Sequence, residues 1–412
     1  MNSLQDQIDR IADEMEGPSC SVIVQVGQLD WMGDLLRHEA REIERRRSFI
    51  SARELMADLA PYSEPGAGRS RKSAKASAKR SKKTQSAKSS AEQISVRRAS
   101  QEDVRSKHRT DLSGFLSNDW VKGLVDKSRP AARKRKRPKS ATSVAMLTAP
   151  HFEISGSAVL NVTKDELHGL QAQLDGVPVS AVFINQRVRK PPIAKADDMP
   201  PEVRDNKAYT WGLSRTGAMA CWGAFSARGS GVKVAVLDTG VDRRHPDLKG
   251  KLAGFAEFDR DGHIVKEGVS KAYDSDQHGT HCAAIIAGGA KSGRMIGMAP
   301  EATILAAMVL PNGEGYDSQI LAGIDWAVQQ GADVISMSLG GVQMTPDVID
   351  TYTRAIINCN RLGIPVVVAV GNDGSQITGP PGNDYFAFTV GATDVLDRAA
   401  GFSGGRTQII TK

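Results

Sequence analysis

The chain has 412 residues, which is enough for two or three domains at about 150 residues each. Its hydrophobic fraction of 40% and charged fraction of 25% are typical of a globular protein, and they exclude a wholly disordered, collagen-like or disulfide-stapled chain. The net charge of +7 is unevenly distributed, because residues 69–139 carry 23 Lys and Arg against 6 Asp and Glu. This segment therefore carries +17, and the rest of the chain is acidic at −10.

Apolar runs, the first residues and the cysteine spacing indicate which classes of protein are not expected. The longest strongly apolar run, Ile364 to Val370, is far shorter than the roughly 20 residues that a membrane-spanning helix needs. The first residues lack the apolar core of a signal peptide, so we expect a cytoplasmic protein without a membrane partner, with secretion by another route left open. A zinc knot or a disulfide framework is not expected, because the four cysteines are widely separated: Cys20, Cys221, Cys282 and Cys359.

Residues 1–65 are predicted to form a small, mainly helical region. Ser21 to Val26 is a candidate strand, and a capping-box pattern predicts a further helix over residues 51–59. We favour a packing element over a partner-binding or oligomerising module. Apolar residues at helical spacing define the first helix: Leu4, Ile8, Ile11 and Met15.

Residues 66–141 are predicted to be a basic, low-complexity linker. Residues 69–90 contain nine Lys and Arg and no acidic residue, so they cannot bury enough apolar surface to offset their chain entropy. One hypothesis is that residues 69–139 bind nucleic acid or an anionic surface, and RKRKRP resembles a nuclear import signal. The alternative is a solvated linker, which we favour because no aromatic stacking pattern accompanies the charge. Apolar residues over 112–124 predict one short amphipathic helix within it.

The remainder is predicted to form two domains. Residues 142–200 read as a small α+β domain, with strands at Ser155–Val162 and Val179–Val188 around a helix at Lys164–Leu174. Residues 205–412 alternate Val/Ile-rich strands with helical patterns, which is typical of a parallel sheet with helices on both faces. The strands are VKVAVLD, ATILAAMVL, ADVISMSLG and IPVVVAVGN, and the helices are His278–Gly288, Asp317–Gln330 and Pro346–Leu362.

Three places in this α/β region carry candidate chemistry. Asp238 ends an apolar strand, where the catalytic groups of parallel sheets gather, although an Asp there can also simply cap a turn. His278 opens a helix and could act as a general base, with a carboxylate fixing its tautomer. Asn372 follows a buried strand and could donate to an oxyanion, or it could only form a turn. We expect His281 to be a packed or hydrogen-bonded core residue, and metal binding by the two histidines is a weak alternative.

Taken in order, VKVAVLDTGVDRRHPDL, HGTHCAAIIAG, SMSLGG and VVVAVGNDG closely resemble the subtilase family of subtilisin-like serine proteases. The resemblance implies a three-layer subtilisin-like α/β fold that begins near Trp211. It implies that Asp238 orients the histidine, that His278 is the general base and that Asn372 donates to the oxyanion. It also implies substrate-binding segments at Ser338, Leu339 and Gly340 and at Ala369, Val370 and Gly371, and hence a peptide or protein substrate.

Two further features follow from the resemblance. HGTHC resembles the proteinase K-like branch, in which Cys282 lies under the histidine and is not the nucleophile. Residues 142–200 resemble the subtilase propeptide, an inhibitor-like domain, which implies intramolecular inhibition of a zymogen.

The pattern departs from the family at the nucleophile. No Gly-Thr-Ser segment occurs in the chain, and Ser403 falls where the family has a turn well before the catalytic serine. We therefore expect a C-terminally incomplete peptidase domain with an exposed apolar patch, inactive by itself. The leading hypothesis is a serine endopeptidase, and the alternative is a pseudoprotease or peptide-binding half-enzyme.

No cofactor is expected, with calcium left open. Asp247 matches a calcium ligand of the family. However, Lys291 stands where a side-chain oxygen would be needed, and a cation there repels Ca²⁺.

Overall fold

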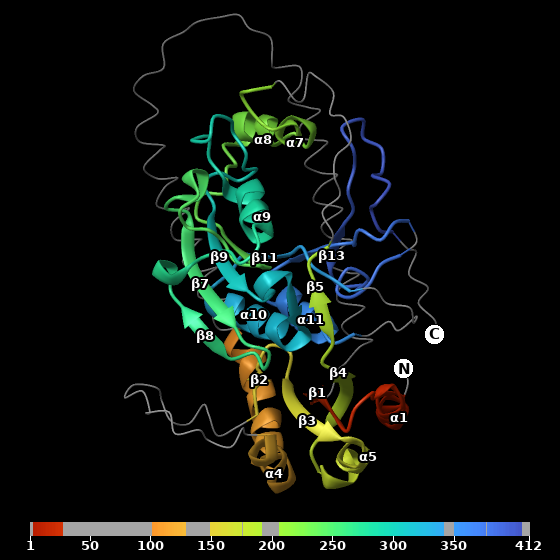
Figure 1. Ribbon diagram of the computed structural model, residues 1–412. Coiled ribbons are helices and arrows are strands. Elements are labelled where there is room, and N and C mark those ends of the chain that lie inside the picture. The colour runs from red at the N-terminus through yellow and green to blue at the C-terminus, as the bar shows by residue number, and fades with distance from the viewer. Residues whose placement is uncertain are drawn as a thin grey trace, which may run out of the picture. The chain divides into compact units, whose positions relative to one another are not determined.

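A computed structural model describes residues 3–27, 101–128, 149–174, 176–191, 206–341, 350–375 and 377–405. Met1–Gln28 and Val104–Lys412 belong to one compact unit, and the contacts below lie within it. Its described strands form a seven-stranded sheet, a four-stranded sheet and a two-stranded ribbon (Figure 1). None of the helices described in these ranges is both long and apolar enough to cross a membrane.

The seven-stranded sheet has the order β13-β12-β11-β6-β9-β7-β8. Neighbouring strands are parallel, as the sequence predicts, except for the β7–β8 hairpin, which is antiparallel. The strands are β6 (Lys233–Asp238), β7 (Leu252–Phe258), β8 (Ile264–Glu267), β9 (Thr303–Met308), β11 (Val334–Met337), β12 (Val366–Ala369) and β13 (Phe388–Val390).

Helices cover both faces of this sheet, which confirms the α/β prediction. Helix α9 (His278–Ala287) packs small residues such as Ala283 against Val236 and its neighbours on one face. On the other face, Gly323 of α10 (Asp317–Gln329) lies so close to Leu237 that an added Cβ would be 3.2 Å from that side chain. Helix α11 (Thr353–Arg361) contacts α10 and β12. The alternation of Val236 and Leu237 therefore separates two cores.

Shorter elements complete the larger part of the chain. Helices α7 and α8 precede β6, and β10 lies between β9 and α10. The bounds are α7 (Trp211–Arg215), α8 (Ala218–Phe225) and β10 (Glu314–Tyr316), with 3₁₀ turns at Pro246–Leu248, Val269–Lys271 and Pro311–Gly313.

The four-stranded sheet has the order β2-β3-β1-β4 and is antiparallel. The predicted strand and helix are confirmed as β3 (Ser157–Thr163) and α5 (Lys164–Gln173). The strand predicted over Val179–Val188 is shorter, because β4 ends at Ile184 (Val179–Ile184) and residues 187–189 form a separate strand that pairs elsewhere. The short β2 (His151–Phe152) pairs with β3. The remaining strand, β1 (Ser19–Val26), comes from the beginning of the chain and lies between β3 and β4.

The central place of β1 corrects the predicted domain boundaries. Residues 1–65 are not a separate helical region, because β1 and the helix before it, α1 (Leu4–Glu14), belong to the same small domain as residues predicted to span 142–200. Residues 21–26 of β1 are buried, so the strand requires both neighbours to satisfy its backbone groups. The helix predicted over 51–59 lies outside the described residues.

The predicted linker is also partly folded. Residues 104–117 are helical, and α4 (Asp119–Ser128) follows after a break at Asn118, whose side-chain oxygen accepts hydrogen bonds from the backbone N–H groups of Trp120 and Val121. One helix over 112–124 was therefore the wrong prediction. These helices pack with α1 and α5 into one core, to which they contribute Leu112, Phe115, Val121 and Leu124. The basic segments 69–90 and 129–139 lie outside the described residues.

The small sheet is tied to α10 and α11 by buried polar groups. The Asp325 carboxylate of α10 accepts hydrogen bonds from the backbone N–H groups of Glu153 and Ile154 at 3.0 and 2.8 Å. Arg354 of α11 is 2% exposed and donates to the backbone carbonyls of Val26 and Gly27, at the end of β1. Because every one of these contacts is directional, the small domain is fixed in orientation as well as in place.

Candidate active site

Asp238 lies at the carboxyl end of β6, near the middle of the seven-stranded sheet. Strands β11 and β9 flank β6, and the Asp238 side chain is completely buried. Its Oδ1 accepts a hydrogen bond from the backbone N–H of Thr239 at 2.7 Å. The carboxylate is thus held at the strand edge where α/β proteins place their functional groups.

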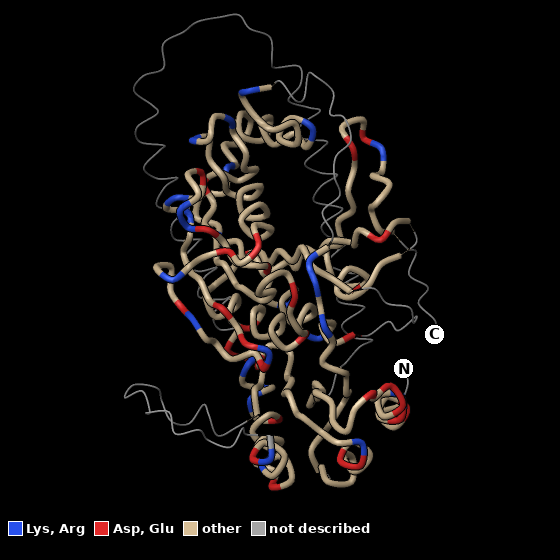
Figure 2. Tube along the Cα trace, in the orientation of Figure 1, with Lys and Arg blue, Asp and Glu red and all other residues tan. Residues whose placement is uncertain are grey.

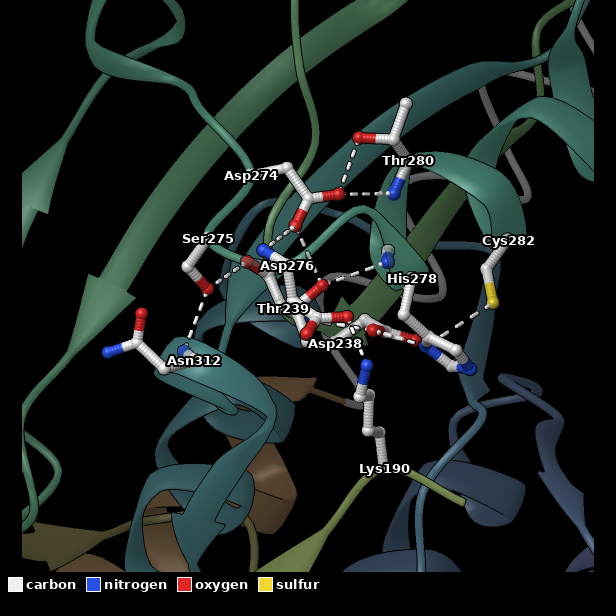
Figure 3. Close-up of polar contacts among 11 residues, drawn as sticks. Lys190, Asp238, Thr239, Asp274, Ser275, Asp276, His278, Thr280, Cys282 and Asn312 are labelled. Carbon is white, nitrogen blue, oxygen red and sulfur yellow. Dashed lines mark hydrogen bonds and ion pairs between the residues drawn. The ribbon is translucent and has the colours of Figure 1, made fainter. Parts of the chain in front are cut away.

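His278 meets this carboxylate from the first residue of α9. Its Nδ1 lies 2.7 Å from Oδ1 of Asp238, and its side chain is 12% exposed (Figure 3). An acid–base imidazole needs this arrangement, because the carboxylate orients the ring and stabilises its charged form.

Gly279 allows α9 to begin so close to β6. A Cβ on Gly279 would lie 2.1 Å from the backbone oxygen of Gly240, so no side chain can be accommodated without moving backbone. Its N–H donates to the Thr239 hydroxyl at 2.9 Å. The segment after β6 and the start of α9 are therefore in direct backbone contact, and this contact sets the separation of Asp238 and His278.

Asp274 organises the same two segments, a role that sequence reasoning did not assign. Its carboxylate accepts hydrogen bonds from the Thr239 hydroxyl at 2.8 Å and from the backbone N–H groups of Asp276 and Thr280 at 2.9 and 2.7 Å (Figure 3). The signal in the sequence was an acidic residue four positions before the helix-opening histidine. Asp274 therefore supports the position of the acid–base pair.

The electrostatics favour the charged form of His278. Burial lowers its pKa, but the hydrogen bond and the negative charge of Asp238 outweigh burial, so the pKa is raised above the usual 6.5. The positive charge of Lys190 lowers the pKa of His278, and the negative charge of Asp276 raises it.

We expect Asp238→Asn to lower the pKa of His278, because the hydrogen bond to a full negative charge is lost while burial remains. NMR titration of the ring measures this directly. In the native chain the pair stabilises the fold fully below pH 6.5, and that contribution is lost as the pH rises through the raised pKa. His263, whose pKa is raised by its hydrogen bond to Asp259, is the internal control and should not move. An unchanged His278 titration would contradict the proposed coupling.

Cys282 lies one turn after His278 on α9. Its Sγ is 3.9 Å from the Nδ1 of His278, and burial raises the pKa of the thiol far above its usual value. A hydrogen bond to Ser338 connects the thiol to the end of β11. The sulfur is therefore a neutral neighbour of the imidazole and is not poised as a nucleophile.

The other predicted site residues lie along the same sheet edge. Ser338, Leu339 and Gly340 follow β11, and Asn372 follows β12, so β11 separates the Asn372 strand from the Asp238 strand. Ala369 is the last residue of β12, and Val370 and Gly371 lead from it to Asn372. Gly371 has a φ of 102°, and its carbonyl accepts a hydrogen bond from the backbone N–H of Gly404 at 2.8 Å. Ser403 lies in this turn, where its hydroxyl accepts from the N–H of Ala392 at 3.0 Å.

His281 is exposed, contrary to the expectation of a core residue. It lines a cavity of about 1340 Å³ between α9 and the segment that contains α7. Helical spacing places it about one turn from His278, but the cavity leaves no packed core at that position.

The segment that precedes the larger domain is bound by backbone pairing close to the acid–base pair. Strand β5 (Arg187–Arg189) pairs antiparallel with β10 on one side, and Arg189 forms an antiparallel bridge with Gly340 on the other. Gly340 N–H donates to the Arg189 carbonyl at 3.3 Å, and Lys190 N–H donates to the Gly313 carbonyl at 3.0 Å. Strand β5 is thus the middle strand between β10 and Gly340, and we call the space between these two neighbours the cleft.

Metal-ligating groups are few in the described part of the chain. The Asp247 carboxylate accepts hydrogen bonds from the backbone N–H groups of Lys291 and Ser292 at 2.5 and 3.3 Å. Among the described residues, the one group of three potential ligands is Asp238, His278 and Cys282, whose ligand atoms lie within 4.8 Å of one another. These residues form the acid–base pair and its neighbour, so a metal there would displace the Asp–His hydrogen bond.

Large apolar side chains are exposed on β13 and in the segment that follows it. Among the described residues, Phe388 is 63% exposed, Val390 45%, Leu396 60% and Phe402 38%. An exposed apolar patch was expected from the sequence; in the structure Phe388 and Val390 expose apolar surface on β13, the outermost strand at that side of the sheet.

This geometry defines an acid–base site at the carboxyl edge of an α/β sheet. A model of the subtilase family matches residues 229–411. The chain is 36% identical over 217 residues to the major intracellular serine protease of Bacillus subtilis, covering 50% of this chain and 65% of that protein. It is 37% identical over 204 residues to the intracellular serine protease of Paenibacillus polymyxa, covering 48% and 60%. It is 38% identical over 198 residues to subtilisin BL of Lederbergia lenta, covering 48% and 68%.

The chain belongs to the subtilase family. It spans 65% and 60% of the length of the two intracellular relatives.

Proposed function

We propose that the protein is a serine endopeptidase in which Asp238 and His278 form the acid–base part of the site. The observation that carries this proposal is the 2.7 Å contact between His278 Nδ1 and Asp238 Oδ1 in a chain of the subtilase family. His278 removes the proton from a serine hydroxyl as that oxygen attacks the peptide carbonyl, and Asp238 stabilises the resulting imidazolium. Asn372 donates to the oxyanion of the tetrahedral intermediate.

The proposal assigns no serine within the 412 residues, because the sequence contains no Gly-Thr-Ser segment and Ser403 is engaged in a turn. The 412 residues by themselves are therefore proposed to bind peptide without cleaving it. A fluorophosphonate probe tests this: it should leave the purified chain unlabelled but label the protein isolated from its source cells. Labelling of neither would favour the alternative, a peptide-binding pseudoprotease, and labelling of the 412-residue chain would refute the missing nucleophile.

We also propose that the small domain is an intramolecular, propeptide-like inhibitor. Strand β5 supports this proposal, because it lies between β10 and Gly340 and ends beside His278. A strand added to a cleft edge by main-chain hydrogen bonds is a common way to bind an extended peptide. A cytoplasmic location is proposed from the relatives, two of which are named intracellular.

No calcium ion is proposed at Asp247, because backbone N–H groups already satisfy that carboxylate. We therefore expect EDTA to leave the melting temperature of the chain unchanged within about 1 °C. A fall of several degrees, restored by added Ca²⁺ but not by Mg²⁺, would show that a calcium site exists.

A further inference from the structure

Strand β5 and the residue after it, which lie between β10 and Gly340, carry three basic side chains. Arg187, Arg189 and Lys190 fall within four consecutive residues, and β5 is the blue stretch near the centre of Figure 2. The groups that surround its end are acidic: Asp238, Asp274 and Asp276 (Figure 3).

Alternation along the strand separates its side chains into two sets. Val188 is 4% exposed, and Lys190, two residues further, is half-buried, whereas Arg187 and Arg189 are exposed. Because successive side chains of a strand point to opposite faces, Val188 and Lys190 face the protein. The two side chains that face the protein are therefore apolar at Val188 and basic at Lys190, with the outward-facing Arg189 between them.

The surroundings of Lys190 accommodate both the aliphatic stem and the charged end of its side chain. A Cβ added to Gly313 would lie 3.1 Å from Cε and 3.4 Å from Cδ of Lys190, so the aliphatic stem passes directly over this glycine. The ammonium group forms an ion pair with the Asp276 carboxylate (Figure 3). Gly313 thus leaves room for the stem, and Asp276 binds the charged end.

Burial makes this ion pair selective. The Lys190 and Asp276 side chains are 23% and 25% exposed, so an apolar residue in the place of Lys190 would leave the carboxylate partly desolvated and without this ion pair. The pair between Arg187 and Glu314 differs, with side chains 67% and 49% exposed. Solvent and salt screen such an exposed pair, so it contributes little to selection.

The loop that carries Asp276 is fixed in the site. The Asp276 N–H donates to the Asp274 carboxylate, which also binds Thr239 and Thr280 at either side of the acid–base pair. A charge on a fixed loop contributes to recognition because binding does not have to order it.

We propose that Asp276 is a specificity-determining residue and that this cleft selects extended peptides with a lysine in the place of Lys190 and an apolar residue two positions before it. The proposal rests on the proposed peptide-binding function and adds a substrate class to it. The chain's own strand, with Val188 and Lys190, has this sequence pattern and occupies the site in the structure.

The first test uses the full 412-residue chain and its own strand as the ligand. Hydrogen exchange should show loss of protection at the Lys190 and Gly340 N–H groups in Lys190→Glu, by about tenfold, because the carboxylates repel. The double reversal Lys190→Glu with Asp276→Lys should restore protection. Arg187→Glu is the matched control, with an expected change below about twofold. Unchanged protection in Lys190→Glu would overturn the proposal.

The second test adds a peptide to the Lys190→Glu chain, in which the binding of the chain's own strand is weakened. Fluorescent peptides with the sequence of residues 184–191, carrying Lys or Ala at the seventh position, are compared by anisotropy. We expect the Lys peptide to bind about tenfold more tightly, with the preference reduced by Asp276→Asn and by added salt. Equal binding of both peptides would overturn the selectivity and leave the peptide-binding function standing. Failure of both peptides to bind would count against the function as well.

Discussion

Replacing Gly279 by alanine should destabilise the protein by about 3 kcal/mol, because the new Cβ would lie 2.1 Å from the carbonyl oxygen of Gly240. Backbone atoms on both sides of the contact belong to segments that cannot shift independently, since Thr239 and Asp274 hold them together. Denaturant unfolding followed by circular dichroism measures the loss, and the His278 titration reports whether the Asp238 contact survives.

Gly223→Ala is the control for this experiment. Gly223 lies inside helix α8 with open space where its Cβ would be, so the substitution should be neutral or stabilising by up to about 1 kcal/mol. Equal stability of the two variants would mean that the close approach of α9 to the segment after β6 is wrong.

The second large effect concerns peptide hydrolysis and rests on the proposed function, which requires a catalytic serine beside His278. Asp238→Asn should lower kcat by about 10⁴-fold, because an amide cannot hold the histidine in the required tautomer or stabilise its charge. Hydrolysis of a chromogenic peptide measures the loss. KM should change little, since Asp238 is completely buried.

A carboxylate of the small domain provides the matched control for that measurement. Asp119 is 99% exposed at the start of α4, and Asp119→Asn should leave kcat within about twofold. Full activity in Asp238→Asn would remove Asp238 from the catalytic role and with it the proposed mechanism.

Local sequence patterns predicted the strands β6, β9, β11 and β12 of the larger domain and the acid–base site, but they missed β7, β8 and β13. A Val/Ile-rich run ending in Asp238 and a small-residue helix opening at His278 each specify one element, and parallel packing then brings their ends to one edge. The resemblance to subtilases named the same residues. These predictions depend on neighbours in sequence, which is why they needed no knowledge of the fold.

The small domain was harder because its pairing is non-local. Residues 19–26 have the same apolar pattern whichever strands flank them, so nothing near β1 indicates that β3 and β4 are its neighbours. The break at Asn118 was missed because apolar residues recur every four positions across it, at Leu112, Leu116, Trp120 and Leu124. The pairing of Lys190 with Asp276 likewise depends on the register of β5 against β10, which composition does not specify.

The central strand of the small sheet is separated from its neighbour β3 by roughly 130 residues of chain. Loop-closure entropy grows only logarithmically, at about 0.6 kcal/mol for each doubling, so this long detour costs little at equilibrium. It matters for the order of events during synthesis, because β1 must wait for residues up to Ile184 before both of its ladders can form. At that point β6 has not yet been made, so the small domain can assemble on the ribosome before the larger sheet and before the helices α10 and α11 to which it is tied.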